Sequence, residues 1–66
     1  PNDNQAIAVT NAFPDVDIAI LRSPDLLARE IARLEKEMKA LSRDLKFEEA
    51  AKVRDKVVSL REFVMQ

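Results

Sequence analysis

From Leu27 onward, large apolar residues recur along the chain at alternating spacings of four and three positions. One series consists of Leu27, Ile31, Leu34, Met38, Leu41 and Leu45, and a second consists of Ala50, Val53, Val57, Leu60 and Val64. This spacing puts the members of a series on one side of an α-helix and is typical of a coiled-coil seam. The pattern predicts two amphipathic helices joined by the short segment between Leu45 and Glu49.

So short a connection makes the two helices antiparallel neighbours. In such a hairpin, residues that face each other have position numbers with a constant sum. Five pairs meet this condition: Leu41 with Ala50, Met38 with Val53, Leu34 with Val57, Ile31 with Leu60, and Leu27 with Val64. The register puts the reversal at Leu45-Lys46. It also predicts two ion pairs beside the seam, Glu35 with Arg54 and Glu37 with Lys56.

The start of the first long helix carries a clear signal. In Ser23-Pro24-Asp25, a hydroxyl can cap the helix, a proline stands where no N–H is needed, and an acid lies at the positive end of the dipole. The reversal has no glycine. We therefore expect a residue near Asp44 or Lys46 to take the tight backbone conformation that the turn needs, which Asp tolerates better than most residues.

The first 22 residues give a weaker pattern. Val16 to Ile20 alternates in character like a strand, and Ile7 to Val9 resembles a second strand. Residues 1–22 are therefore expected to form an extended or β-like arm or a disordered linker, and residues 23–66 the hairpin. The predicted fold class is mainly α: an antiparallel two-helix hairpin preceded by an extended or short β-strand arm.

The amino-acid composition excludes most kinds of catalytic and metal-binding site. The 66 residues include no Cys, His or Gly, which excludes cysteine- or histidine-ligated zinc, disulfides, thiol or imidazole catalysis and glycine loops that hold phosphate. Glu48 and Glu49 are neighbours on a helix and point about 100° apart, so they do not form an acid–base pair. We expect no catalytic, cofactor-binding or metal-binding residues, and the chain is not expected to be an enzyme.

The charges are nearly balanced, with 11 Lys and Arg against 12 Asp and Glu. The outer side of the first long helix has a basic stripe made of Arg29, Arg33, Lys36 and Arg43. Acids run beside this stripe, so we favour a solvated, ion-paired face over direct contact with nucleic acid, which stays the alternative. No apolar run approaches the length of a membrane span, and we expect a soluble, cytoplasmic protein with no membrane partner.

Phe47 is the residue that the seam does not explain. It lies beside the turn, and its own hairpin cannot bury it fully. Ala51, Val58 and Met65 continue an apolar stripe from Phe47 along the second helix, wider than one partner helix can cover. The predicted interface residues are Phe47, Ala51, Arg54, Val58 and Met65. Two alternatives remain: the arm covers the stripe, or Arg54 serves only its own hairpin.

The segment from Ile31 to Leu60 resembles the UVR motif, which is named for the excision-repair proteins UvrB and UvrC. The residues that carry the resemblance are Leu34-Glu35, Met38, Leu45, Phe47-Glu48, Ala50-Ala51, Arg54-Asp55 and Leu60, and the run from Leu45 to Asp55 is its most specific part. Lys46 departs from the family pattern, in which an acidic or polar residue is commoner.

The resemblance implies a helical hairpin that binds another protein. Its partner would be a second copy, giving a homodimer, or the homologous hairpin of another protein. In the repair proteins the motif links UvrB to UvrC, which implies a role in nucleotide excision repair. Related hairpins in Clp-type chaperone ATPases and their adaptors supply an alternative setting.

Overall fold

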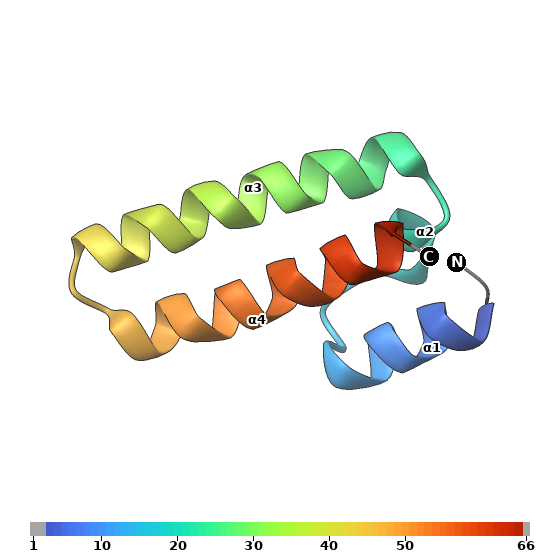
Figure 1. The fold of residues 1–66 in the computed structure, drawn as a ribbon, viewed down its shortest axis with the longest axis horizontal. Coiled ribbons are helices and arrows are strands. Elements are labelled where there is room, and N and C mark those ends of the chain that lie inside the picture. The colour runs from blue at the N-terminus through green and yellow to red at the C-terminus, as the bar shows by residue number, and fades with distance from the viewer. Residues whose placement is uncertain (1–2, 66) are drawn as a thin grey trace.

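The computed structural model describes residues 3–65, and every regular element within that range is a helix. The four helices are α1 (Asp3–Ala12), α2 (Ile18–Leu21), α3 (Pro24–Arg43) and α4 (Phe47–Val64). Figure 1 shows α3 and α4 as an antiparallel hairpin along the long axis, with α1 and α2 at its open end. The mainly helical class is confirmed, and the extended or β-strand arm is wrong.

Helix α3 begins where the sequence predicts. Ser23 is extended, and its hydroxyl oxygen accepts a hydrogen bond of 3.3 Å from the Leu26 N–H. Pro24 occupies the first turn without leaving a donor unpaired, and Asp25 lies near the positive end of the helix dipole. These three residues fix the point at which the chain enters the hairpin.

The reversal between α3 and α4 is a Schellman turn. The Lys46 N–H donates to the Leu41 carbonyl at 2.9 Å, and the Leu45 N–H donates to the Ser42 carbonyl at 3.1 Å. Leu45 has φ of 63°, whereas Asp44 and Lys46 have negative φ. The tight conformation expected near Asp44 or Lys46 is confirmed at Leu45, the residue between them, because these hydrogen bonds put Leu45 at the left-handed position.

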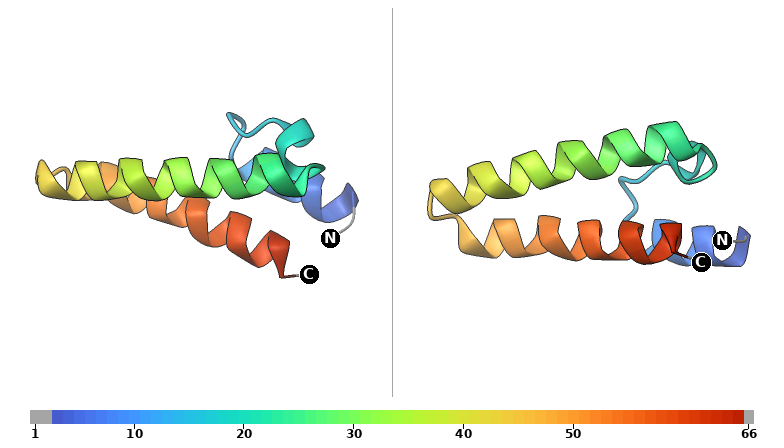
Figure 2. Two further views of the ribbon diagram at one scale, coloured as in Figure 1. Left: turned by 90° about the horizontal axis from the view of Figure 1, so that it is seen from above. Right: turned by 45° about the horizontal axis from the view of Figure 1, so that its top comes forward.

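The hairpin core follows both apolar series except at their ends. Its buried members are Leu27, Leu34, Ala50, Val53, Val57, Leu60 and Phe63. At the open end Val64 is 54% exposed and Phe63 only 5% exposed, so the predicted outermost layer of Leu27 with Val64 is wrong. Figure 2 shows why: α3 and α4 diverge away from the turn, and the arm lies beside them there. Phe63 faces the arm and is buried in the position that the sequence register assigned to Val64.

The arm is helical because its apolar residues follow a helical spacing that the short alternating runs obscured. Ala6, Val9 and Phe13 are three and four positions apart, and all three contribute to the core. Asp17 caps α2, since its carboxylate accepts a 3.0 Å hydrogen bond from the Ala19 N–H. Two isolated strands leave their outer backbone groups unpaired, whereas a helix pairs its own.

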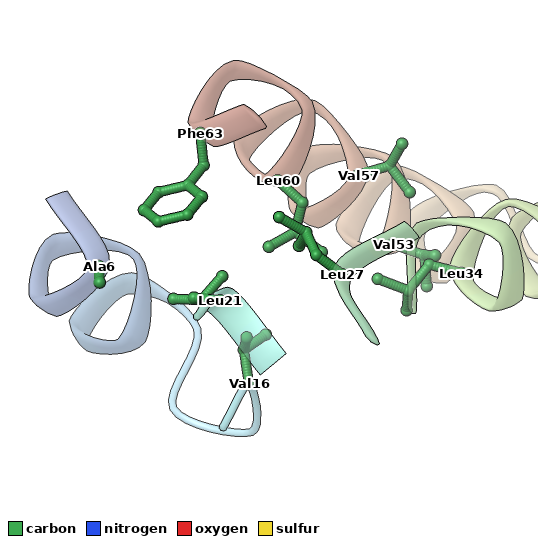
Figure 3. Close-up of a cluster of buried hydrophobic side chains, with 9 residues drawn as sticks. All are labelled: Ala6, Val16, Leu21, Leu27, Leu34, Val53, Val57, Leu60 and Phe63. Atoms are coloured by element: carbon green, nitrogen blue, oxygen red, sulfur yellow. The ribbon is translucent and has the colours of Figure 1, made fainter. Parts of the chain in front are cut away.

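Arm and hairpin share one hydrophobic core. Ala6, Val16 and Leu21 are buried in the same cluster as Leu60 and Phe63 of α4. Figure 3 shows the Phe63 ring beside Leu21 and near Ala6, with Val16 below Leu21. Helix α1 packs on α2 and α4, while α2 packs on α3. Residues 3–22 therefore cover the open half of the hairpin on one side.

Both predicted ion pairs beside the seam are wrong. The observed pairs are Glu35 with Arg61, Arg54 with Asp55, Lys56 with Asp15, and Glu37 with Arg33. Lys56 lies on the side of α4 that the arm approaches, so Asp15 takes the place predicted for Glu37. Glu37 has Arg33 one turn away on its own helix.

Candidate protein-interaction surface

The turn exposes two large apolar side chains close together in the chain. Phe47 is the first residue of α4, and its side chain is 62% exposed. Leu45, which the sequence pattern put in the seam, is 72% exposed. The left-handed conformation of Leu45 ends the helical periodicity, so its side chain no longer follows the buried side of α3. Sequence reasoning therefore missed Leu45 as a surface residue.

A groove of about 260 Å³ lies between α3 and α4 near the turn. Its lining comprises Met38, Ser42, Phe47, Ala50, Ala51 and Arg54. The structure thus brings together three of the predicted interface residues, namely Phe47, Ala51 and Arg54. Met38 from α3 supplies an apolar wall opposite them. The arrangement offers an apolar recess with a guanidinium in its lining.

The other two predicted interface residues lie farther along α4. Val58 is exposed in the middle of the helix, and Met65 is exposed at the C-cap, just beyond the last helical residue. Neither lines the groove. The predicted set is therefore a stripe along α4, whose best-defined part is the groove beside Phe47.

This stripe lies on the side of α4 away from the arm. The arm meets α4 at Lys56, which pairs with Asp15, and at Ser59 and Phe63, which line a shallow cavity together with residues of α1. At 100° per residue, Val58 lies about 200° around the helix from Lys56. Val58 and Met65 stay exposed although the arm is docked. The alternative in which the arm covers the stripe is therefore wrong.

Arg54, the charged residue of the stripe, is paired within the chain. Arg54 contacts its neighbour Asp55 at 3.4 Å, and both side chains are well exposed, so this pair contributes little to stability. The alternative in which Arg54 pairs with Glu35 is wrong, because Glu35 accepts a hydrogen bond from Arg61 instead. Arg54 is therefore held only by a weak local contact and can reorient toward a partner.

The basic stripe of α3 is partly neutralised. Arg33 contacts Glu30 at 2.8 Å and Glu37 at 3.3 Å. The hydrogen bond from Arg33 lowers the pKa of Glu30, and the same bond raises the pKa of Arg33. Both groups keep their charges at neutral pH. This pairing supports the interpretation of the outer side of α3 as an ion-paired surface.

A larger cavity of about 580 Å³ opens where α1 and α2 meet the hairpin. Its walls are mainly apolar and include Leu21, Leu27 and Ile31, while Asp3 and Arg22 form a 3.7 Å ion pair beside it. No predicted interface residue lines this cavity. The sequence pattern could not indicate it, because part of the lining comes from the arm, which was expected to be a strand or linker.

The described residues offer little else for chemistry. Between residues 3 and 65, no group of three or more Asp, Glu, His or Cys side chains is placed to hold a metal ion. Over that range, no helix is both long enough and apolar enough to span a membrane. The exposed apolar groove beside the turn thus stands out as the site to explain.

Comparisons with known proteins coincide with the hairpin. Residues 28–63 match the family described as the UvrB/uvrC motif. UvrABC system protein B of Pseudomonas aeruginosa is 50% identical over 42 residues, which is 64% of this chain and 6% of that protein. The corresponding protein of Coxiella burnetii is 43% identical over 47 residues, 71% of this chain and 7% of that protein. No solved structure matches the chain at comparable significance.

The chain therefore spans only a small part of the length of these relatives. The family match, however, covers more than half of the chain and contains both helices of the hairpin nearly in full, together with the turn, Phe47 and the groove. It confirms the resemblance that the run from Leu45 to Asp55 carries. This chain belongs to the UvrB/uvrC motif family.

Proposed function

We propose that the chain is a protein–protein interaction module whose hairpin binds a second UVR hairpin, either that of another copy or that of a homologous protein. One observation carries the proposal: Phe47, at the start of α4, keeps 62% of its surface exposed beside an apolar groove. The docked arm leaves this surface open. A partner that buries the Phe47 ring is the simplest reason for an aromatic side chain at that place.

Magnitudes favour an anchor role for Phe47. Full burial of a phenylalanine side chain is worth about 1.5–3 kcal/mol, and aromatic residues are enriched among the few that dominate interface energies. Leu45, exposed two positions earlier, adds apolar surface next to it. Arg54 at the groove supplies a donor for a carboxylate of the partner. The partner surface is thus expected to be apolar with an acidic group at its edge.

The family relation suggests a setting. Similarity to UvrABC system protein B supports a role in joining components of nucleotide excision repair, with a UvrC-type hairpin or a second copy as the partner. A Clp-type chaperone or adaptor system is the alternative, since it would use the same surface. The cytoplasmic location expected from the sequence stays a prediction.

Direct nucleic-acid contact through the basic stripe of α3 is the competing function. Arg33 of that stripe is already paired with two glutamates. A salt titration separates the two functions, because phosphate contacts weaken steeply as salt rises whereas apolar helix packing does not. Duplex DNA binding that fell sharply with salt would support the competing function.

Sedimentation equilibrium of the whole chain tests the proposed association. We expect a concentration-dependent dimer at micromolar concentrations or above. Phe47→Ala should weaken association by about 2 kcal/mol, roughly thirty-fold in Kd, without changing helical content at concentrations where the chain stays folded. Ile7→Ala removes an exposed apolar side chain of α1 and is the matched control that should leave association unchanged.

Leu34→Ala serves as the structural reference. Leu34 is 1% exposed in the hairpin core, and its truncation should destabilise the fold by about 2–5 kcal/mol. If Phe47→Ala lowered helicity as much as Leu34→Ala at saturating concentration, Phe47 would be ordinary core. A well-folded monomer across the whole concentration range would contradict self-association, and partner capture would then rest on a homologous hairpin.

A further inference from the structure

The two sides of the hairpin differ in what covers them. On one side, α1, the Val16 segment and α2 lie against the open half of α3 and α4 (Figure 3). Ala6 and Leu21 from the arm pack in the same cluster as Leu60 and Phe63, which are 0% and 5% exposed. The opposite side carries the groove beside Phe47 and has no cover among the described residues.

The segment that covers one side of the hairpin, residues 3–21, lies outside the family match. The match begins at residue 28, after both arm helices, and includes Leu60 and Phe63, which lie in one buried cluster with residues of the arm. A hairpin without the arm would expose the Phe63 ring next to Leu27 and Leu60. Apolar surface of this kind on a two-helix layer is the surface on which a further helix pair packs. In this chain, residues 3–21 occupy that place.

We propose that residues 3–21 are a built-in partner for one face of the hairpin and confine association with other hairpins to the opposite face. The arm fills the position that another helix pair would take in a larger bundle. Assembly then stops at one partner per chain, because only the face beside Phe47 stays available. The inference rests on the proposed function in one respect, since it concerns which face a second hairpin can use.

Polar contacts position the cover. Lys56 on α4 is mostly buried, with 17% of its side chain exposed, and it donates a hydrogen bond to Asp15 in the segment between α1 and α2. The Asp3–Arg22 ion pair joins the beginning of α1 to the end of α2. The arm therefore docks as a unit, with apolar contacts at its centre and ion pairs at its edges.

A charge placed beneath the arm tests the inference in the full chain. Ala6 is 2% exposed, so Ala6→Glu should lift α1 off the hairpin. Ala19→Glu, at an exposed position of α2, makes the same chemical change as a matched control. We expect amide exchange within residues 3–12 to accelerate at least tenfold in Ala6→Glu alone. Sedimentation equilibrium should then give species larger than those of Ala19→Glu, because the uncovered face recruits further copies.

Phe47→Ala, combined with each variant, separates this inference from the proposed function. If Phe47→Ala leaves association unchanged but Ala6→Glu still enlarges the species, the cover is supported and the Phe47 interface is wrong. If Phe47→Ala abolishes pairing while Ala6→Glu frees the arm without changing the mass relative to Ala19→Glu, the cover inference is overturned and the function stands. Continued protection of α1 in Ala6→Glu would also overturn it.

Asp15→Lys provides a second variant should Ala6→Glu prevent folding. The Asp15 side chain is 66% exposed, so the change cannot disrupt the hairpin core, yet it puts a positive charge against Lys56. Faster exchange in α1 and a larger associated species are expected in the same direction as for Ala6→Glu, with a smaller effect. Faster exchange with the mass of the wild-type chain would count against the cover.

Discussion

The Lys56 ammonium donates a hydrogen bond to the Asp15 carboxylate across 41 positions of sequence. This contact joins the segment between α1 and α2 to the middle of α4. It also holds the pKa of Asp15 below its ordinary value, because the hydrogen bond and the nearby positive charge favour the ionised carboxylate. The docking of the arm is consequently linked to proton binding.

Acid should loosen the arm, and Asp15→Asn should remove part of that response. The pKa of Asp15 is lower in the folded chain, so its contribution to stability is present above the ordinary aspartate value of about 3.9 and is lost as pH falls below it. Thermal unfolding of both chains from neutral pH downward checks this. The wild-type chain should unfold at a higher temperature than Asp15→Asn near neutral pH, and this difference should shrink in acid. A difference that grew in acid would contradict the stabilising role of the ionised Asp15 carboxylate.

Leu45→Gly should stabilise the chain. At φ of 63° a side chain with a Cβ is strained by roughly 1–2 kcal/mol, and glycine relieves the strain at some loss of chain entropy, leaving a gain of up to about 1 kcal/mol. Leu45→Ala is the control, since it removes the exposed leucine but keeps the Cβ. In denaturant-induced unfolding, Leu45→Gly should have a higher midpoint concentration than Leu45→Ala. Equal midpoints for the two variants would argue against strain at Leu45.

Phe63 should matter far more than its neighbour Val64. Phe63→Ala should destabilise the chain by about 3–5 kcal/mol, because the ring is buried between α4 and the arm. Val64→Ala should have a much smaller effect, since Val64 is mostly exposed. Urea unfolding of the two variants measures the difference. The seam register read from the sequence predicts the reverse order, so this pair of variants decides between them.

A double-mutant cycle should find coupling between Glu35 and Arg61 and none between Glu35 and Arg54. Because Arg61 is about half exposed, the expected coupling is only about 0.2–1 kcal/mol and should fall at high salt. Alanine variants of the three residues, alone and in pairs, give the two cycles. Coupling of Glu35 with Arg54 and none with Arg61 would instead support the ion pair expected from the sequence register.

The hairpin was predictable because its signals act locally and agree with one another. The apolar spacing of α3 and α4, the Ser23 cap and the short reversal each depend on neighbouring residues alone. The ends of the register were not predictable in this way. Whether Phe63 or Val64 turns inward depends on the arm, and the charge partners of Glu35 and Lys56 depend on how the helices diverge.

The secondary structure of the arm was predicted wrongly because the short run from Val16 to Ile20 alternates like a strand. The three-and-four spacing of Ala6, Val9 and Phe13 indicates a helix, but it spans only two turns of a chain with weak helix signals. Tertiary packing against Leu60 and Phe63 decides the outcome. For the interface set, the exposure of Phe47 beside a groove supports the prediction, and its role in binding stays a prediction.

The open end of the molecule brings the first turn of α1 and the last turn of α4 together, since Asp3 and Val64 line the same cavity. The turn that bears Leu45 and Phe47 lies at the opposite end of a molecule 36 Å long (Figure 1). A fluorophore attached at the beginning of α1 would lie far from Phe47. A chain immobilised on a sensor through that end of α1 would present its turn to the solution, where the proposed partner binding can be measured.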